Sequence, residues 1–276
     1  MKKEKEVQKN TSMWNKFGSN LQILPIVIAV LMVGGISVTF YLAYIHFKHV
    51  TYLLPYISDT GTIPPESCIF GFVLNILSFL LGVAVYIKYL HVEEICKKHH
   101  ISKNCSYNKV AIFVGGLTVL GINLVANFQE TNAPVVHWSG AILCFVAGSL
   151  YLSAQTYIYI KISPVLGQRK TTMFRIFLSI VAVSTSVICV GTGLKALSEF
   201  TGEDVTKWQA DDGGAKLHQI STNSEWICAT ALLIYILLFY KEFKDIVWEG
   251  PKIILVERIT ALGSPNITAG SSPKLP

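Results

Sequence analysis

The stretch that decides the fold is residues 21–46, LQILPIVIAVLMVGGISVTFYLAYIH, which contains no Lys, Arg, Asp or Glu. A hydrocarbon core of about 30 Å takes roughly 20 helical residues to cross, so this stretch can span a bilayer as one helix. It is longer than the roughly 7 to 15 apolar residues of a signal-peptide core, and no small-residue cleavage site follows it. We therefore expect a permanent transmembrane helix here.

Five further apolar windows of similar length follow along the chain. Hydrophobic residues make up 51% of the sequence and charged residues only 14%, a balance that is not typical of a soluble domain. The expected fold class is all-α, a polytopic membrane protein with six transmembrane helices in one bundle. The six predicted spans are Leu21–His46, Ser67–Leu90, Lys109–Asn127, Val135–Ile160, Thr172–Leu194 and Ile220–Tyr240.

The basic residues predict which helix ends face the cytosol. Of the 23 Lys and Arg residues, 19 lie in residues 1–20, in the segments 88–109 and 161–175, and after residue 240. Cationic segments resist translocation, so we expect a basic cytosolic extension at 1–20, a transmembrane domain at 21–240, and a cytosolic tail at 241–276 with a flexible end. The net positive charge of the chain is then explained by the basic residues of its cytosolic segments. Its expected partners are anionic or phosphoinositide lipid headgroups, and we expect no nucleic acid.

Polar and small side chains recur at helical spacing along the second, third and fourth spans. Such a face of a membrane helix is expected to contact protein rather than lipid. We therefore expect these three helices to turn their polar faces toward one another. The residues concerned are Gly71, Asn75, Ser78 and Gly82 in the second span, Asn123 and Asn127 in the third, Gln129 just after it, and His137 at the start of the fourth.

The sixth span carries the ionisable residue on which the functional hypothesis depends. Its purely apolar part, Ile227–Tyr240, rises only about 21 Å as a helix, so the crossing helix must also include Glu225. An ionisable residue inside a membrane is a functional-site hypothesis by default, and His137, His218 and Asp59 are its expected neighbours. The alternative is structural, because membrane amides commonly only join adjacent helices and a carboxylate close to an interface can snorkel.

No catalytic motif supports an enzyme. The chain has no G-x-S-x-G, H-E-x-x-H or Walker sequence, and the Cys and His residues between 96 and 105 match no standard zinc spacing. We expect no catalytic activity, no cofactor and no metal. Two alternatives stay open. One is a lipid-modifying enzyme in which His137 or His218 acts as base and Glu225 or Asp59 orients it. The other is a proton-coupled transporter.

Several motifs occur in a fixed order around these candidates: the segment 55–68, Phe70-Gly71, Asn75, the run Val125-Ala126-Asn127-Phe128-Gln129-Glu130, His137 with Gly140-Ala141, and His218 with Glu225-Trp226. Together they resemble the DRAM family, the DNA-damage-regulated autophagy modulators, over roughly Met13 to Lys244. The resemblance implies a six-span protein of lysosomal or endolysosomal membranes that promotes autophagy without an established catalytic activity. It implies autophagy proteins or other lysosomal membrane proteins as partners.

Short sorting patterns are compatible with a lysosomal membrane, with the endosomal and plasma membranes as alternatives. Residues 240–243 and 107–110 fit a tyrosine-based signal, and residues 249–254 are dileucine-like. The leading hypothesis is a non-enzymatic modulator in which a polar cavity between the helices binds a lipid headgroup or a partner. Protonation of Glu225, His137 and His218 would then sense luminal acidity.

Overall fold

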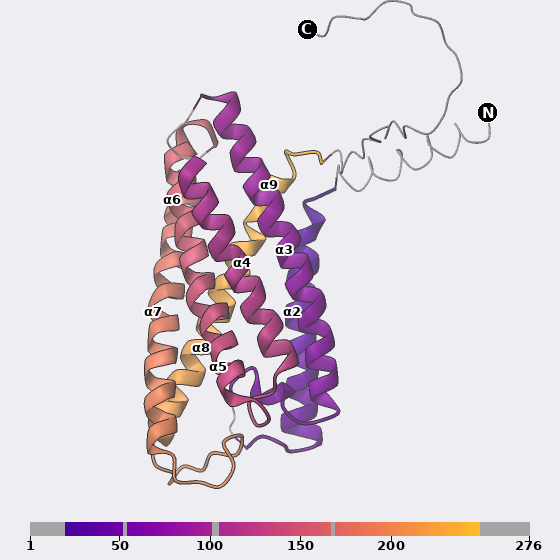
Figure 1. The fold of residues 1–276 in the computed structure, drawn as a ribbon, viewed down its shortest axis with the longest axis vertical. Helices are drawn as coiled ribbons and strands as arrows, with labels where there is room; N and C mark the ends of the chain where they lie inside the picture. Colours follow the sequence, from indigo (N-terminus) through magenta and orange to yellow (C-terminus); the bar gives the residue numbers. More distant parts are fainter. Residues whose placement is uncertain (1–19, 52–53, 101–104, 167–168, 249–276) are drawn as a thin grey trace, which may run out of the picture.

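A computed structural model describes residues 20–51, 54–100, 105–166 and 169–248. This part of the chain contains no β-strand, and its helices run side by side along one axis (Figure 1). Six helical segments are long and apolar enough to cross a membrane. The predicted class, an all-α polytopic membrane protein with six spans, is confirmed.

Several of the six spans combine more than one helical element. The first joins α2 to a π-helical turn, the fourth contains a π-helical turn between two α-helices, and the sixth ends in a short separate helix. The bounds are α2 (Ile23–Phe40) with η1 (Tyr41–His46), α3 (Glu66–Lys98), α4 (Cys105–Asn127), α5 (Pro134–Ile142) with η4 (Leu143–Ala147) and α6 (Gly148–Leu166), α7 (Arg169–Glu199), and α8 (Ala215–Leu237) with α9 (Phe239–Phe243).

Most helices extend past the predicted windows. The clearest case is α3, which continues from the predicted end at Leu90 to Lys98. The added turns carry charged residues such as Glu93 and Lys97, which hydropathy excludes from a span. A helix needs apolar side chains only while it crosses hydrocarbon, so these turns project beyond the membrane.

The two ends of the bundle differ in what they contain. At one end, which we call the N/C end, α2, α4 and α7 begin and α3, α6 and α9 end (Figure 1). At the opposite end, which we call the loop end, lie residues 47–51 and 54–65, 128–133 and 200–214. The last of these gives way to α8 after Gly214, whose φ of 79° favours glycine.

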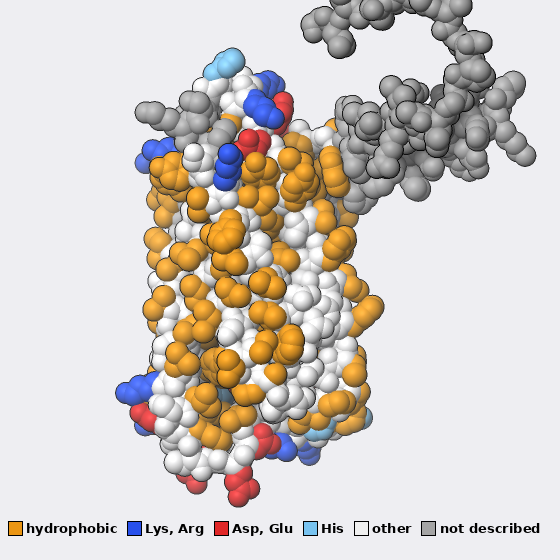
Figure 2. Space-filling view, in the orientation of Figure 1, with side chains coloured by type: hydrophobic (Ala, Val, Ile, Leu, Met, Phe, Trp, Pro, Cys, Tyr) orange, Lys and Arg blue, Asp and Glu red, His pale blue; other side chains and the backbone are white. Residues whose placement is uncertain are grey.

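The sides of the bundle are apolar. Figure 2 shows hydrophobic side chains along its length, with Lys, Arg, Asp and Glu gathered at the two ends. Large side chains such as Phe72, Phe113 and Val187 are exposed. An apolar surface this extensive is unfavourable in water and favourable against lipid, which agrees with six membrane spans.

A buried charge cluster joins three helices near the N/C end. Glu242 of α9 accepts hydrogen bonds from Lys88 of α3 and Arg175 of α7, and His91 Nδ1 lies 3.8 Å from the same carboxylate. The Arg175 guanidinium also lies over the ring of Tyr235, 5.0 Å from its centroid. Buried cations require such compensation, so the cluster fixes how these helices meet.

The fold places the two tyrosine-based sorting patterns differently. Residues 240–243 lie in the α8–α9 segment with Phe243 fully buried, and residues 107–110 lie in α4 with Asn108 fully buried. Tyr107 and Val110, which define the pattern at 107–110, are exposed, whereas Phe243 of the pattern at 240–243 is buried. Both signals stay predictions. The dileucine-like residues 249–254 lie outside the described residues.

Candidate functional site

The connection between η1 and α3 folds into the loop end of the bundle. Residues 55–62 are all buried, which is unusual for a loop, and they include the short 3₁₀ turn η2 (Asp59–Gly61). A Cβ on Gly61 would lie 2.2 Å from the ring of Phe70 on α3, so only glycine permits this approach. Residues 55–62 therefore form a compact segment.

Side chains of α8 satisfy the backbone of this buried loop. The Ile57 amide donates to Glu225 Oε2 at 2.8 Å, and Trp226 Nε1 donates to the Pro55 carbonyl oxygen at 2.8 Å. The Tyr56 amide donates to Asp59 Oδ2 at 3.1 Å. Irregular backbone at membrane depth is stable only with such partners. Glu225 therefore has a structural role, because it anchors the loop to α8.

Three carboxyl groups meet where this loop touches the bundle. Asp59, Glu225 and Glu130, which lies in the α4–α5 connection, are all buried. Burial raises the pKa of Asp59 well above its usual range, and the neighbouring carboxyl groups of Glu130 and Glu225 raise that pKa further. Like charges at close range disfavour ionisation, so this cluster favours the protonated form of Asp59.

His137 lines a small pocket beside this cluster. The pocket has a volume of about 30 Å³, and Tyr56, Glu130 and Glu225 also line it. His137 Nδ1 lies 2.6 Å from the Phe128 carbonyl oxygen, and because a carbonyl only accepts, Nδ1 carries the proton in this bond. The pocket has room for a water molecule. The predicted proximity of His137 and Glu225 is therefore present in the structure.

His218 occupies a separate environment. Its ring stacks on Trp208 with centroids 4.2 Å apart and meets the Tyr56 ring edge-on at 4.9 Å. The Tyr56 hydroxyl donates to Ser221 Oγ at 2.7 Å. His218 lines neither the pocket of His137 nor the larger cavity described next. The expectation that both histidines gather around Glu225 holds for His137 alone.

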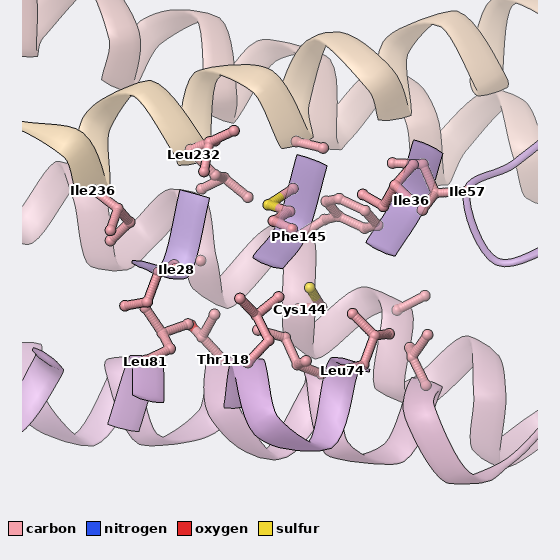
Figure 3. A pocket seen from close by; sticks show the side chains of 18 of the residues that line it. Ile28, Ile36, Ile57, Leu74, Leu81, Thr118, Cys144, Phe145, Leu232 and Ile236 are labelled. Carbon is pink, nitrogen blue, oxygen red and sulfur yellow. The ribbon is translucent and has the colours of Figure 1, made fainter. Parts of the chain in front are cut away.

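A larger cavity of about 130 Å³ extends from Glu225 into the bundle. Figure 3 shows its apolar lining, with Ile57 of the loop beside Ile36 of α2 and with Ile236 of α8 farther along. The helical rise from Glu225 to Ile236 is about 16 Å, so the cavity is elongated. Among the described residues that line it, only Glu225 is acidic or basic. The expected polar cavity is therefore an apolar one with a carboxyl group at its end.

The candidate Asn and Gln side chains do not line the cavity. Asn75, Asn123 and Asn127 bond to one another on the outer surface where α3 meets α4, and Asn123 and Asn127 are exposed. Gln129 lies in the α4–α5 turn, where its side chain pairs with Asn132 at 3.5 Å. The expectation that the polar faces of α3 and α4 turn toward each other is confirmed for Asn75, Asn123 and Asn127, although they meet at the surface of the bundle. Within the described ranges, no group of three or more His, Cys, Asp or Glu residues is arranged to hold a metal ion.

Comparison with known proteins decides the family. Residues 20–246 match the family model described as Frag1/DRAM/Sfk1/Cwh43P N-terminal domain. The chain belongs to this family. The predicted resemblance is confirmed, and no solved structure shows a significant match to the chain.

Curated members of the Frag1/DRAM/Sfk1/Cwh43P family carry names that refer to autophagy. DNA damage-regulated autophagy modulator protein 2 of Bos taurus is 33% identical over 83% of this chain and 86% of its own length. DNA damage-regulated autophagy modulator protein 1 of Mus musculus is 35% identical over 72% of this chain and 81% of its own length. Modulator of macroautophagy TMEM150B-B of Xenopus laevis is 30% identical over 80% of this chain and 85% of its own length.

The sequence did not indicate two chemical groups of the site in this Frag1/DRAM/Sfk1/Cwh43P family member: one carboxyl group and one backbone amide. Glu130 was not among the candidates, although an acidic residue directly after a span and just before Pro134 signals a carboxylate at the membrane boundary. The amide of Ile57 was also missed. A backbone donor leaves no trace in residue type, so no sequence signal could have indicated that Glu225 binds it.

Proposed function

We propose that this membrane protein modulates autophagy by binding a lipid tail in its apolar cavity, without catalysing a reaction. The names of the curated relatives support the process, and the cavity of about 130 Å³ that ends at Glu225 supports the mode of action. An engineered cavity of roughly 150 Å³ binds benzene, so this space suits part of an acyl chain. At about 24 cal/mol per Å³, an empty cavity of this size forgoes about 3 kcal/mol of packing.

The charge around the cavity indicates what kind of polar end the lipid carries. Asp59, Glu130 and Glu225 lie at this end, and no Lys or Arg is among the described residues that line either pocket. A hydroxyl or a protonated amine is complementary to these carboxyl groups, whereas a phosphate or carboxylate is repelled. The proposed ligand is a single-chain amphiphile with a neutral or cationic polar end.

Anionic headgroups, including phosphoinositides, fit the opposite end of the bundle. Lys97, Lys98, Lys109, Lys170 and Lys244 lie near the N/C end. Basic residues just outside a span attract anionic lipids of the cytosolic leaflet. We therefore place the N/C end in the cytosol and the loop end in the lumen of the lysosome, with the endosomal and plasma membranes as alternatives.

In this orientation the carboxyl cluster faces an acidic compartment. Asp59 has a raised pKa beside Glu130 and Glu225, and His137 lies in the adjoining pocket. Acidification of the lumen favours the protonated cluster, so the loop and the cavity respond to luminal pH. Autophagy proteins or other lysosomal membrane proteins that contact the loop end would detect this response.

Binding to matched amphiphiles tests the proposal. Hexadecylamine, hexadecanol and palmitate are titrated against the purified protein in neutral phosphatidylcholine nanodiscs. The amine and the alcohol are expected to bind, and palmitate at least about tenfold more weakly, because a charged hydrogen bond contributes about 1.5–3 kcal/mol. Glu225→Gln should weaken binding of the amine more than that of the alcohol. Equal binding of all three, or none above empty nanodiscs, contradicts the proposal.

Two further controls complete the test. Leu232→Trp fills the cavity and should abolish binding, whereas Leu194→Trp on the exposed face of α7 should not. In cells, Glu225→Gln at normal localisation should alter autophagic flux, and unchanged lipid binding together with unchanged flux would refute the assignment. Mass-spectrometric detection of turnover of the bound lipid would instead favour the enzyme alternative, with His137 as its base.

A further inference from the structure

Three amides form a cluster on the outside of the bundle where α3 meets α4. Asn123 Nδ2 donates to Asn75 Oδ1 at 2.8 Å, and Asn127 Nδ2 donates to the same oxygen at 2.9 Å. Asn75 Nδ2 donates to Asn127 Oδ1 at 3.1 Å and to the Gly71 carbonyl oxygen at 2.9 Å. The neighbouring side chains project away from the protein: Phe72 is 68% exposed and Phe79 is 71% exposed.

A count of hydrogen-bond donors and acceptors shows that the Asn123 side chain does not use all of its hydrogen-bonding groups within the cluster. Both N–H groups of Asn75 are used, and its oxygen accepts twice. Both N–H groups of Asn127 are also used, one by Asn75 and one by the Asn123 carbonyl oxygen at 2.7 Å. Asn123 uses one N–H. Within the part of the chain that the structure describes, its other N–H and its Oδ1 have no hydrogen-bond partner.

The position of Asn123 makes this incompleteness costly. α4 ends at Asn127, so Asn123 lies about 6 Å inside the helix end along the axis. Exposed apolar residues surround it, including Leu120 one turn deeper. Hydrocarbon offers no hydrogen bonds, and polar side chains in spans are typically satisfied by another helix.

We propose that this face binds a second copy of the chain and that the two Asn123 amides bond to each other. All copies insert with the same orientation, so the two-fold axis of a dimer runs along the membrane normal. Rotation about that axis preserves depth, and each residue near the axis meets its own counterpart. A carboxamide is self-complementary, because it donates and accepts, so a pair of Asn123 side chains forms two reciprocal hydrogen bonds.

The surroundings of Asn123 permit this contact. Gly116 lies two turns away on the same face of α4, and a Cβ built there has nothing within 4 Å. The small residue allows a partner helix to approach closely, as at other helix contacts in membranes. Phe72 and Phe79 of α3 flank the face and add apolar area on both sides. Asn123 is exposed and does not line the cavity, so the dimer does not depend on the proposed lipid.

Site-specific photo-crosslinking of the full chain in cell membranes tests the dimer. A benzophenone amino acid replaces Leu120, which is 47% exposed, or Leu194 of α7, which is 50% exposed and serves as the matched control. Position 120 should yield a crosslinked dimer and position 194 should not. With the probe at 120, Asn123→Leu should reduce the dimer about tenfold, and Asn123→Gln, which keeps the amide, should retain most of it.

Two outcomes overturn the proposal. Equal crosslinking at 120 and 194 shows random collision, and no crosslinking at 120 shows that lipid or water satisfies Asn123. A loss of the dimer that is the same for Asn123→Leu and Asn123→Gln also contradicts it, provided that both variants reach the wild-type membrane level.

Discussion

At the scale of single residues, Glu225 connects the loop to the cavity. One oxygen holds the Ile57 amide, and the side chain lines both the apolar cavity and the small pocket of His137. A change at this residue therefore affects loop anchoring and ligand recognition together. Gln keeps an oxygen for the Ile57 amide but removes the charge, so comparing it with Ala separates the two roles.

The buried carboxyl group of Asp59 makes stability dependent on pH. Its pKa is raised in the folded protein, so above about pH 3.9, where a free Asp loses its proton, the folded state binds more protons than the unfolded state. The free energy of unfolding then decreases as pH rises through that window. We expect the melting temperature to fall between pH 5 and about pH 7, with a smaller slope in Asp59→Asn.

A thermal scan in detergent at several pH values measures this slope. Asp211→Asn, at an exposed position of the loop end, is the matched control and should behave like the wild type. A wild-type melting temperature that rises with pH, or an equal slope in Asp59→Asn, would contradict the placement of Asp59 beside Glu130 and Glu225.

The site was only partly predictable at this scale. Glu225 and His137 were found because ionisable residues at span ends are rare and informative. The sequence did not predict that Asn123 and Asn127 lie at the outer surface of the bundle. In a membrane both the lipid-facing and the protein-facing sides of a helix are apolar, so periodicity shows that residues share a face without showing which way it points. The ring of His218 stacks on Trp208. Trp208 lies in a loop, where the spacing of residues in the sequence does not predict contacts.

At the scale of helices, the α3, α7 and α9 elements depend on one carboxylate. Glu242→Gln would leave Lys88 and Arg175 buried and facing each other without a counter-charge. Removing one partner of a buried ion pair costs about 3–5 kcal/mol. Unfolding by SDS titration should show a loss of this size, while Asp245→Asn, an exposed carboxylate three residues further on, should show almost none. A small effect at Glu242 would mean that water reaches the cluster.

The α4–α5 contact depends on a glycine pair. A Cβ on Gly121 would lie 2.4 Å from the Cys144 amide nitrogen and 2.7 Å from the Gly140 carbonyl oxygen, both of them backbone atoms that cannot move aside. Gly121→Ala should destabilise the protein by about 1–3 kcal/mol, measured by the same titration. Gly191→Ala, where nothing lies within 4 Å, should be neutral or slightly stabilising. Equal effects at the two glycines would place the helices farther apart than described.

Helix existence was predictable, and helix detail was not. Each span was found from length and hydropathy, because the hydrocarbon core imposes both. The π-helical turns at Tyr41–His46 and Leu143–Ala147 were not foreseen, since they add a residue per turn without any change in composition. The second of them lies between α5 and α6, so helical spacing counted from residue types alone shifts across it.

At the scale of the whole molecule, the orientation in the membrane remains a prediction that a direct experiment can check. The charge bias predicts that the N/C end is cytosolic and the loop end is luminal. A tag at the C-terminus should be removed by protease added to intact organelles that contain the protein. A tag inserted beside Asp211 should resist protease until the membrane is permeabilised. The reverse pattern, or protection of neither tag, would refute the orientation and with it the response to luminal pH.

The central claim is that the loop and Glu225 close the end of an apolar cavity that holds a lipid tail. A long-chain amine with a diazirine in its tail, activated by light in the intact membrane and mapped by mass spectrometry, tests it most directly. The account predicts labels on the cavity residues Met32, Leu74, Phe145 and Leu232, removed by excess hexadecanol and absent in Leu232→Trp. Labels confined to outward-facing side chains such as Phe72, Phe79 and Val187 would contradict it.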